Sequence, residues 1–235
     1  MKILCVADHV DPLIYTMSAK ERFKDIDLVL SAGDLPMEYL GFISSMLNRP
    51  ILFVFGNHNL KSLTLFNRKI SLYSEIDQFD SYLQNNYGST YTGWKVTRTR
   101  GLLIAGLGGS MRYNDGENQY TDFQMYLKIL KLIPGLLWNK IRYGRYLDIL
   151  LTHAAPFGIQ DQADLCHRGF RAFLWFMRVF KPRYLIHGHV HLYDLNAKRV
   201  DTYYQTQVIN AYDHCVIEID VNEINNKRKG KVKDV

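Results

Sequence analysis

The chain has 235 residues, of which 47% are hydrophobic, 22% charged and 13% aromatic, a balance typical of a globular protein and not of a disordered or fibrous one. Its three cysteines are odd in number and form no CxxC pair, which argues against a disulfide framework or a thiolate zinc site. The formal charge is +6, but residues 225–235 hold five Lys or Arg and one Asp, which leaves 24 basic and 22 acidic side chains in residues 1–224. We therefore expect a single domain over 1–224 and a basic, flexible tail over 225–235, with little attraction to nucleic acid.

Neither a secretion signal nor a membrane span is predicted. The first apolar run, KILCVA at 2–7, begins with a charge and stops at Asp8, so it is too short for a signal peptide. The longest apolar stretch, at 125–138, is interrupted by two lysines, a proline and a glycine and is unsuited to span a bilayer. We expect a cytoplasmic protein with no membrane partner.

Six short runs rich in Ile, Leu and Val predict buried strands. They cover 2–7, 27–33, 51–57, 102–109, 148–154 and 183–189. The stretches between them predict helices over 15–24, 38–48, 75–85, 121–138 and 165–180. Beyond residue 190, runs at 191–195, 199–205, 206–211 and 214–220 predict an antiparallel meander. Helices alternating with strands, followed by antiparallel strands, indicate a layered α/β domain.

Five of the six predicted buried strands end in, or are followed directly by, side chains that bind metals well. These are Asp8, Asp34, Asn57 with His58, His153, and the histidines of HGHVH at 187, 189 and 191. Each residue alone is more simply a cap, a turn former or a structural histidine. The carboxyl ends of strands in an open α/β sheet form the rim where ligands bind, so the set as a whole predicts a metal site. Imidazoles and carboxylates without cysteine favour Mn, Fe or Zn over a structural zinc.

These blocks, read in order, resemble the calcineurin-like metallophosphoesterases. The resemblance rests on Asp8, GD at 33–34, GNH at 56–58, His153 in THAAP and GHVH at 188–191. The loops GLGGSMRYN at 106–114 and GIQDQADLCHRGF at 158–170 are similar to those of a prokaryotic subgroup of that family. The resemblance implies a four-layer αββα sandwich of two mixed β-sheets and a site for two divalent metal ions.

The resemblance also implies a role for each residue. Asp34 would bridge two metal ions, which would be Mn or Fe, with Zn as an alternative. The second site would be completed by Asn57, His153 and His189, and the first by Asp8 and His191. His58 would contact the phosphate and protonate the leaving oxygen. Two cations about 3.5–4 Å apart lower the pKa of bound water, so a metal-activated hydroxide can attack phosphorus. The expected activity is hydrolysis of a phosphodiester, or of a phosphomonoester, on a small substrate.

The first block departs from the family's Asp-x-His pattern, because the chain reads Asp8, His9, Val10. Neighbouring side chains of an extended backbone point to opposite faces, so His9 is not expected to face the metal that Asp8 binds. Three alternatives follow: a bulge that re-aims His9, an oxygen from Asp11, or water, and we favour water or Asp11. A missing nitrogen ligand predicts a weak first site.

Further residues have both a functional and a structural interpretation. Arg112 and the glycines before it could bind a phosphate group. The same residues are equally consistent with a sharp turn in which Arg112 points into solvent. Three polar residues of the 158–170 stretch, Asp161, Asp164 and His167, recur every three residues and would share one side of a helix. They could lie over the metals and contact the substrate. Alternatively, they could cap the helix or orient a metal-binding histidine through a hydrogen bond. Asn57, His58, Arg112 and His167 are the expected substrate contacts.

Two other functions remain open. The first is a nuclease, because basic and aromatic residues are mixed at 94–100 and 138–146, as in proteins that bind single-stranded nucleic acid. Surface strands and helices produce the same pattern, so we rank a nuclease below a phosphoesterase that acts on small molecules. The second is a catalytically weakened protein that binds a phosphorylated ligand on the same scaffold. The sequence leaves the oligomeric state open.

Overall fold

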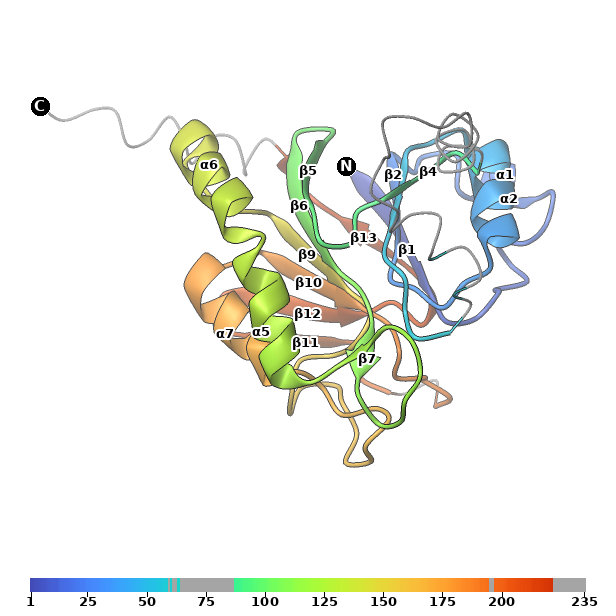
Figure 1. Cartoon of the computed structure of the whole chain (residues 1–235). Coiled ribbons are helices and arrows are strands. Elements are labelled where there is room, and N and C mark those ends of the chain that lie inside the picture. The colour runs from blue at the N-terminus through green and yellow to red at the C-terminus, as the bar shows by residue number, and fades with distance from the viewer. Residues whose placement is uncertain (59, 61–62, 64–86, 195–196, 222–235) are drawn as a thin grey trace, which may run out of the picture.

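The computed structural model describes residues 1–58, 60, 63, 87–194 and 197–221. Two mixed β-sheets face each other, and helices cover the outer side of each (Figure 1). The first sheet has the order β13-β1-β2-β3-β4. Its strands are β1 Lys2–Ala7, β2 Leu28–Ser31, β3 Ile51–Phe53, β4 Ser89–Tyr91 and β13 Asp213–Glu218. Strands β1 to β4 are parallel, and β13 is antiparallel to β1.

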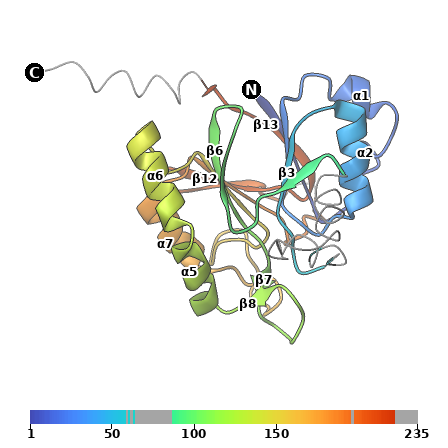
Figure 2. The ribbon, with the colours of Figure 1, turned by 45° about the horizontal axis from the view of Figure 1, so that its top comes forward.

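The second sheet has the order β11-β12-β10-β9-β6-β5. Its strands are β5 Val96–Thr99, β6 Leu102–Leu107, β9 Ile149–Thr152, β10 Tyr184–His187, β11 Val200–Tyr203 and β12 Thr206–Asn210. The four inner strands are parallel and both edge strands are antiparallel to their neighbours. A short parallel pair, β7 Ser110–Met111 and β8 Gln119–Tyr120, projects beyond the carboxyl ends of both sheets (Figure 2).

The apolar core lies in three layers, which explains why the central strands read as continuous apolar runs. Along β1, Leu4 and Val6 face the helices of the first sheet, while Ile3 and Cys5 face the second sheet. Successive side chains of a strand point to opposite faces, so a strand covered on both sides needs apolar residues at every position.

Helices α1 Ala19–Arg22 and α2 Met37–Leu47 cover the first sheet, and α5 Asp122–Leu130, α6 Ile133–Tyr143 and α7 Arg171–Phe180 cover the second. Thr121 caps α5 in a capping box with Gln124, which satisfies backbone N–H groups at the start of that helix. The predicted α/β sandwich of two mixed sheets between helical layers is confirmed.

The predicted strands were placed more accurately than the helices. The stretch 121–138 holds two helices, because Pro134 occupies the first turn of α6 and suits a helix start better than a helix interior. The stretch 15–24 holds only the four residues of α1, and 165–180 becomes helical only at Arg171. The helix predicted over 75–85 and the tail over 225–235 lie outside the described residues.

The predicted antiparallel meander is confirmed only for β11 and β12, which pair as neighbours. Residues 191–194 form no strand, β12 lies parallel to β10, and β13 leaves the second sheet to pair with β1 in the first. Apolar patterning shows that a segment is extended but not which strand it pairs with. Among the described residues no helix has the length and apolar character that crossing a membrane requires.

Candidate metal centre

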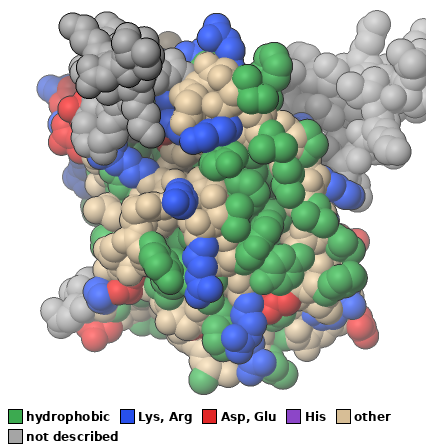
Figure 3. Space-filling model, turned by 90° about the vertical axis from the view of Figure 1, so that its left-hand side faces the viewer, with side chains coloured by type: hydrophobic (Ala, Val, Ile, Leu, Met, Phe, Trp, Pro, Cys, Tyr) green, Lys and Arg blue, Asp and Glu red, His purple; other side chains and the backbone are tan. Residues whose placement is uncertain are grey.

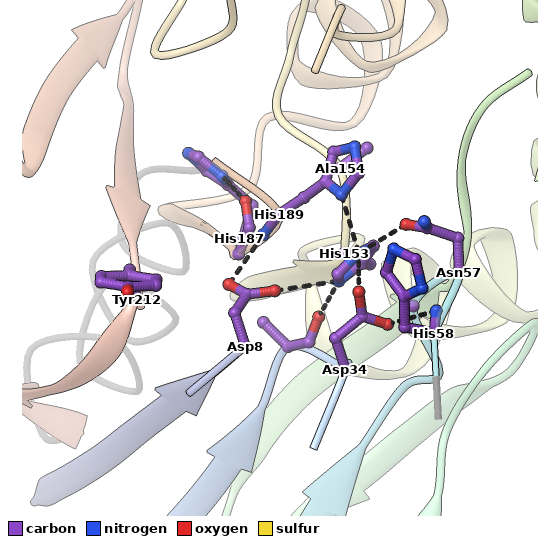
Figure 4. A network of polar contacts seen from close by, with 12 residues as sticks. Asp8, Asp34, Asn57, His58, His153, Ala154, His187, His189 and Tyr212 are labelled. Carbon is purple, nitrogen blue, oxygen red and sulfur yellow. Dashed lines mark hydrogen bonds and ion pairs between the residues drawn. The ribbon is translucent and has the colours of Figure 1, made fainter. Parts of the chain in front are cut away.

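The carboxyl ends of β1, β2, β3, β9 and β10 bring five polar side chains together (Figure 4). These are Asp8, Asp34, Asn57, His153 and His189. Three of them have a left-handed backbone, with φ of 66° at Asp8, 57° at Asp34 and 68° at His189. This conformation is unfavourable for a residue other than glycine and is concentrated at functional sites, where the surrounding structure enforces it.

Three potential ligand atoms lie close to the Nε2 atom of His153. His153 Nε2 lies 3.1 Å from Asn57 Oδ1, 3.1 Å from His189 Nδ1 and 3.3 Å from Asp34 Oδ2. One ligand atom each from Asp34, His153 and His189 lies within 4.8 Å of the other two. A carboxylate, an amide oxygen and two imidazoles make a mixed oxygen and nitrogen set that suits Mn, Fe or Zn.

Hydrogen bonds outside the cluster fix which ring nitrogen of each histidine is free. His153 Nδ1 donates to the carbonyl oxygen of Ala32 at 2.8 Å, and His189 Nε2 donates to that of Cys166 at 2.7 Å. A carbonyl oxygen only accepts, so the opposite nitrogens present lone pairs to each other. Two lone pairs 3.1 Å apart beside a carboxylate require a positive charge between them, and the donor set therefore fits a divalent cation.

The pKa values show the same demand for positive charge. Burial lowers the pKa of His153, but Asp34 and Asp8 outweigh it and raise the value to about 9. Burial raises the pKa of Asp34, yet His153 and the backbone N–H of His58 bring it down to about 2. Burial, followed by the charge of His153, lowers the pKa of His189 to about 3. Without a metal ion, a proton on His153 supplies the charge.

Asp8 stands beside this cluster in a buried position. Its Oδ2 accepts the backbone N–H of His189 at 2.8 Å, and its Oδ1 lies 3.9 Å from His153 Nδ1. Oδ1 is buried and has no hydrogen-bond partner within the described part of the chain. Burial raises the pKa of Asp8 to about 7. A buried carboxylate oxygen without a partner fits a second cation beside the first.

His9 and Asp11 are held elsewhere. His9 Nδ1 lies 2.6 Å from Asp213 Oδ1, beyond the end of β1 at Ala7. Asp11 contacts His214 Nδ1 with Oδ2 and accepts the backbone N–H of Leu13 with Oδ1. Neither is among the convergent donors of the described residues.

His191 also stands apart from the four donors. Its ring stacks on that of Tyr212, with centroids 4.8 Å apart, and its Nδ1 lies 2.7 Å from the Tyr193 hydroxyl. Val10 packs against the apolar cluster beneath the helices of the first sheet. Of the expected first-site ligands, the structure therefore brings Asp8 and Asp34 to the cluster, and His191 to the tyrosines.

The glycines of the motifs make room for these side chains. A Cβ at Gly188 would lie 2.6 Å from Asp8 Oδ2 and 2.6 Å from the Cβ of Ala7, and a Cβ at Gly56 would overlap the carboxylate of Asp34. Both positions therefore exclude any larger residue, which explains why glycine precedes Asn57 and His189.

The expected substrate contacts surround the centre unevenly. His58 is exposed, and its backbone N–H donates to Asp34 Oδ1 at 2.8 Å. Arg112 is exposed, with Nη2 3.4 Å from Gln124 Oε1. The Asn57 side chain donates to the Tyr113 hydroxyl at 3.2 Å, which turns its oxygen toward His153. Nothing in the amino-acid pattern indicates how Tyr113 is oriented.

The loop 158–170 lies against the cluster but is not helical, so the three-residue spacing of its polar residues has a different origin. Asp164 Oδ1 accepts the backbone N–H groups of Cys166 and His167, and Asp161 accepts that of Gly169. The ring of His167 lies 5.2 Å from that of His189. The backbone carbonyls of Cys166 and Ala32, which fix the histidine tautomers, leave no signal in the sequence.

Comparisons with known proteins agree with this fold. The family model described as Calcineurin-like phosphoesterase matches residues 1–193. The structure of TT1561 from Thermus thermophilus is similar with a TM-score of 0.60 at 13% identity, over 95% of each chain. A second solved chain has a TM-score of 0.61 at 14% identity, over 92% of this chain and 94% of its own.

A weaker likeness links the chain to a solved archaeal phosphodiesterase, with a TM-score of 0.39 at 15% identity over 91% of this chain and 84% of that one. The search of curated proteins returned no match.

Proposed function

Because this chain belongs to the calcineurin-like phosphoesterase family, we propose that it is a phosphoric ester hydrolase that uses two divalent cations and acts on a small phosphorylated substrate, with a phosphodiester preferred to a monoester. One observation carries the proposal: the Nε2 atom of His153 and the Nδ1 atom of His189 face each other beside oxygens of Asp34 and Asn57.

Asp34, Asn57, His153 and His189 would hold the cation of the second site, and Asp8 with Asp34 would hold that of the first. Mn or Fe suits this oxygen-rich set, with Zn as an alternative. When bound, such cations lower the pKa of water and neutralise charge on phosphoryl oxygens. His191 would join the cation of the first site only through the nitrogen that Tyr193 does not contact.

The chain's own residues position and protonate the substrate. His58 is exposed beside Asp34, where its imidazole can reach a leaving oxygen and donate the proton that an alkoxide needs. Tyr113 holds the amide of Asn57 so that its oxygen stays directed at the metal position. Arg112 would reach phosphate only by leaving Gln124.

The test is hydrolysis of a chromogenic phosphodiester and monoester with added Mn²⁺. Asp34→Ala is expected to remove activity and metal together. His58→Ala should keep the metal and lose on the order of 10²-fold or more in kcat, most with a poor leaving group. Asp115→Ala, in the exposed part of the 112–118 loop, is the control. Failure of the metal-loaded protein to turn over either substrate would refute the hydrolase.

A weakened binder of phosphorylated ligands remains the alternative. It is favoured by Val10 at the ligand position and by the engagement of His9 with Asp213. This alternative predicts tight binding of inorganic phosphate or a nucleotide with at most one metal ion and no turnover.

A further inference from the structure

Helices α5 and α6 expose a band of large apolar side chains on the outer surface of the second helical layer. We call this band the helical patch; it consists of Phe123, Leu127, Leu130, Leu137, Trp138 and Ile141. Their exposed fractions run from 44% at Leu127 to 80% at Ile141. Figure 3 faces this layer and shows hydrophobic side chains gathered in a band bordered by Lys and Arg.

The helical patch is a second apolar stripe on helices that already have a buried one. Met125, Ile129 and Leu136 are fully buried against the second sheet, which accounts for the inward face. Phe123, Leu127 and Leu130 repeat at helical spacing on the opposite side. A surface helix normally carries polar residues there, so a contiguous exposed band indicates a binding surface.

Positive charge predominates around the helical patch, although α5 begins with the half-buried Asp122 next to Phe123. Residues 123–147 and 171–183, which include most of α5 and all of α6 and α7, hold nine Lys or Arg and no Asp or Glu. Lys131, Lys140 and Arg142 are exposed next to the apolar side chains. Such a surface attracts an anionic partner.

We propose that the helical patch binds the surface of an anionic phospholipid bilayer. A helix that lies in the interface has aromatic and aliphatic residues on one side and Lys or Arg beside them, as here. Lys and Arg can place their stems along the apolar band while their charges reach lipid phosphates.

Charge favours the bilayer over a second copy of the chain. A two-fold contact through the helical patch would bring exposed Lys131, Lys140 and Arg142 near the same cations of the second copy. Asp122, the acid at the start of α5, is half-buried and already accepts the backbone N–H of Ala172. Because α5 and α6 have nine and eleven residues, they would lie on the membrane and not cross it. The lysines, proline and glycine within 125–138 exclude a membrane-spanning helix and leave binding to the membrane surface possible.

The experiment is flotation of the full-length protein with vesicles of phosphatidylcholine alone, or of phosphatidylcholine and phosphatidylglycerol in equal parts. We expect binding to the anionic vesicles, weakened by salt, and little binding to the neutral ones. Trp138→Ser with Ile141→Ser should weaken binding on the order of tenfold or more. Met17→Ser, at an equally exposed residue beside α1 (77%), should leave it unchanged.

Two further measurements keep the proposal falsifiable. Thermal unfolding should be unchanged in the double variant because both side chains are exposed, and Lys131→Gln with Lys140→Gln should weaken binding while the apolar band is retained. Absence of binding to anionic vesicles would overturn the proposal, as would equal binding to neutral ones. Self-association that Trp138→Ser abolishes would assign the helical patch to a second copy instead.

Discussion

The backbone N–H of His189 donates to Asp8 Oδ2 at 2.8 Å and so joins the loop after β10 to the end of β1, 181 residues earlier in the chain. One carboxylate oxygen therefore maintains the fold, while the other is buried without a hydrogen-bond partner among the described residues. Asp8 has two separable roles, and substitutions can distinguish them.

Asp8→Asn should stabilise the metal-free protein at pH 8. Burial raises the pKa of Asp8 from 3.8 to about 7, so the folded state binds more protons than the unfolded state between these values and stability falls as the pH rises through that window. The neutral amide of Asn does not need to be buried as a charge. Asp8→Asn should therefore increase the free energy of unfolding by on the order of 2–4 kcal/mol at pH 8 and leave it unchanged below pH 4. Urea unfolding in chelator at both pH values measures it.

Asp8→Ala serves as the comparison, because it also removes the acceptor for the His189 N–H and should destabilise by about 1–3 kcal/mol relative to Asp8→Asn. An Asp8→Asn effect of equal size at pH 4 and pH 8 would contradict the assigned titration.

His153→Ala should remove the tightly bound metal and lower kcat by on the order of 10²-fold or more, since its Nε2 is the donor nearest to the other three. His9→Ala is the matched control: its side chain pairs with Asp213, so metal content and most activity should remain. Metal content and hydrolysis are measured on the same samples of both variants. Equal losses of metal and activity in His153→Ala and His9→Ala would show that His9 belongs to the metal centre.

The two metal ions should leave at different chelator concentrations. Four donors converge on one position, whereas the other has Asp8 with the shared Asp34, His9 engaged elsewhere and Val10 unable to bind. Metal content followed during stepwise chelation should show one labile ion and one retained ion. Simultaneous release of both would refute the asymmetry.

His187 should make the protein sensitive to mild acid. Burial lowers the pKa of its imidazole from 6.5 to about 4, and its Nε2 lies 2.8 Å from Gln160 Oε1. The unfolded state binds the proton more readily between these values, so stability falls as the pH drops from 6.5 to 4, by about 3 kcal/mol.

His187→Gln should flatten that part of the stability profile. The difference between wild type and variant, measured by urea unfolding in chelator, isolates this group from the other histidines. A constant difference across pH 4 to 6.5 would show that His187 does not titrate as proposed.

The sequence predicted the strands and the polar residues at their carboxyl ends because both can be recognised from short stretches of sequence. Continuous apolar runs arise where a strand is covered on both faces, and Asp8, Asn57 and His153 follow those runs within a few residues. The positions of Asp34 and His189 were predicted in the same way, from glycine motifs that the structure explains by close packing at Gly56 and Gly188.

What the sequence did not predict depends on pairing between distant segments. The transfer of β13 to the first sheet, the stacking of His191 on Tyr212 and the carbonyl of Cys166 that orients His189 are set by tertiary contacts. The exposed apolar face of α6 was equally hidden, because a helix with two apolar sides reads as a buried one until its packing is known.

The pairing of β13 with β1 has a consequence for synthesis of the protein. During translation the amino-terminal strand is made first, yet its outer neighbour is complete only when residue 218 has been added. Asp213 also contacts His9, so the first motif becomes fully ordered only after residue 213 has been added. A ribosome-bound intermediate lacking this segment would leave β1 exposed along one edge and should be a substrate for chaperones.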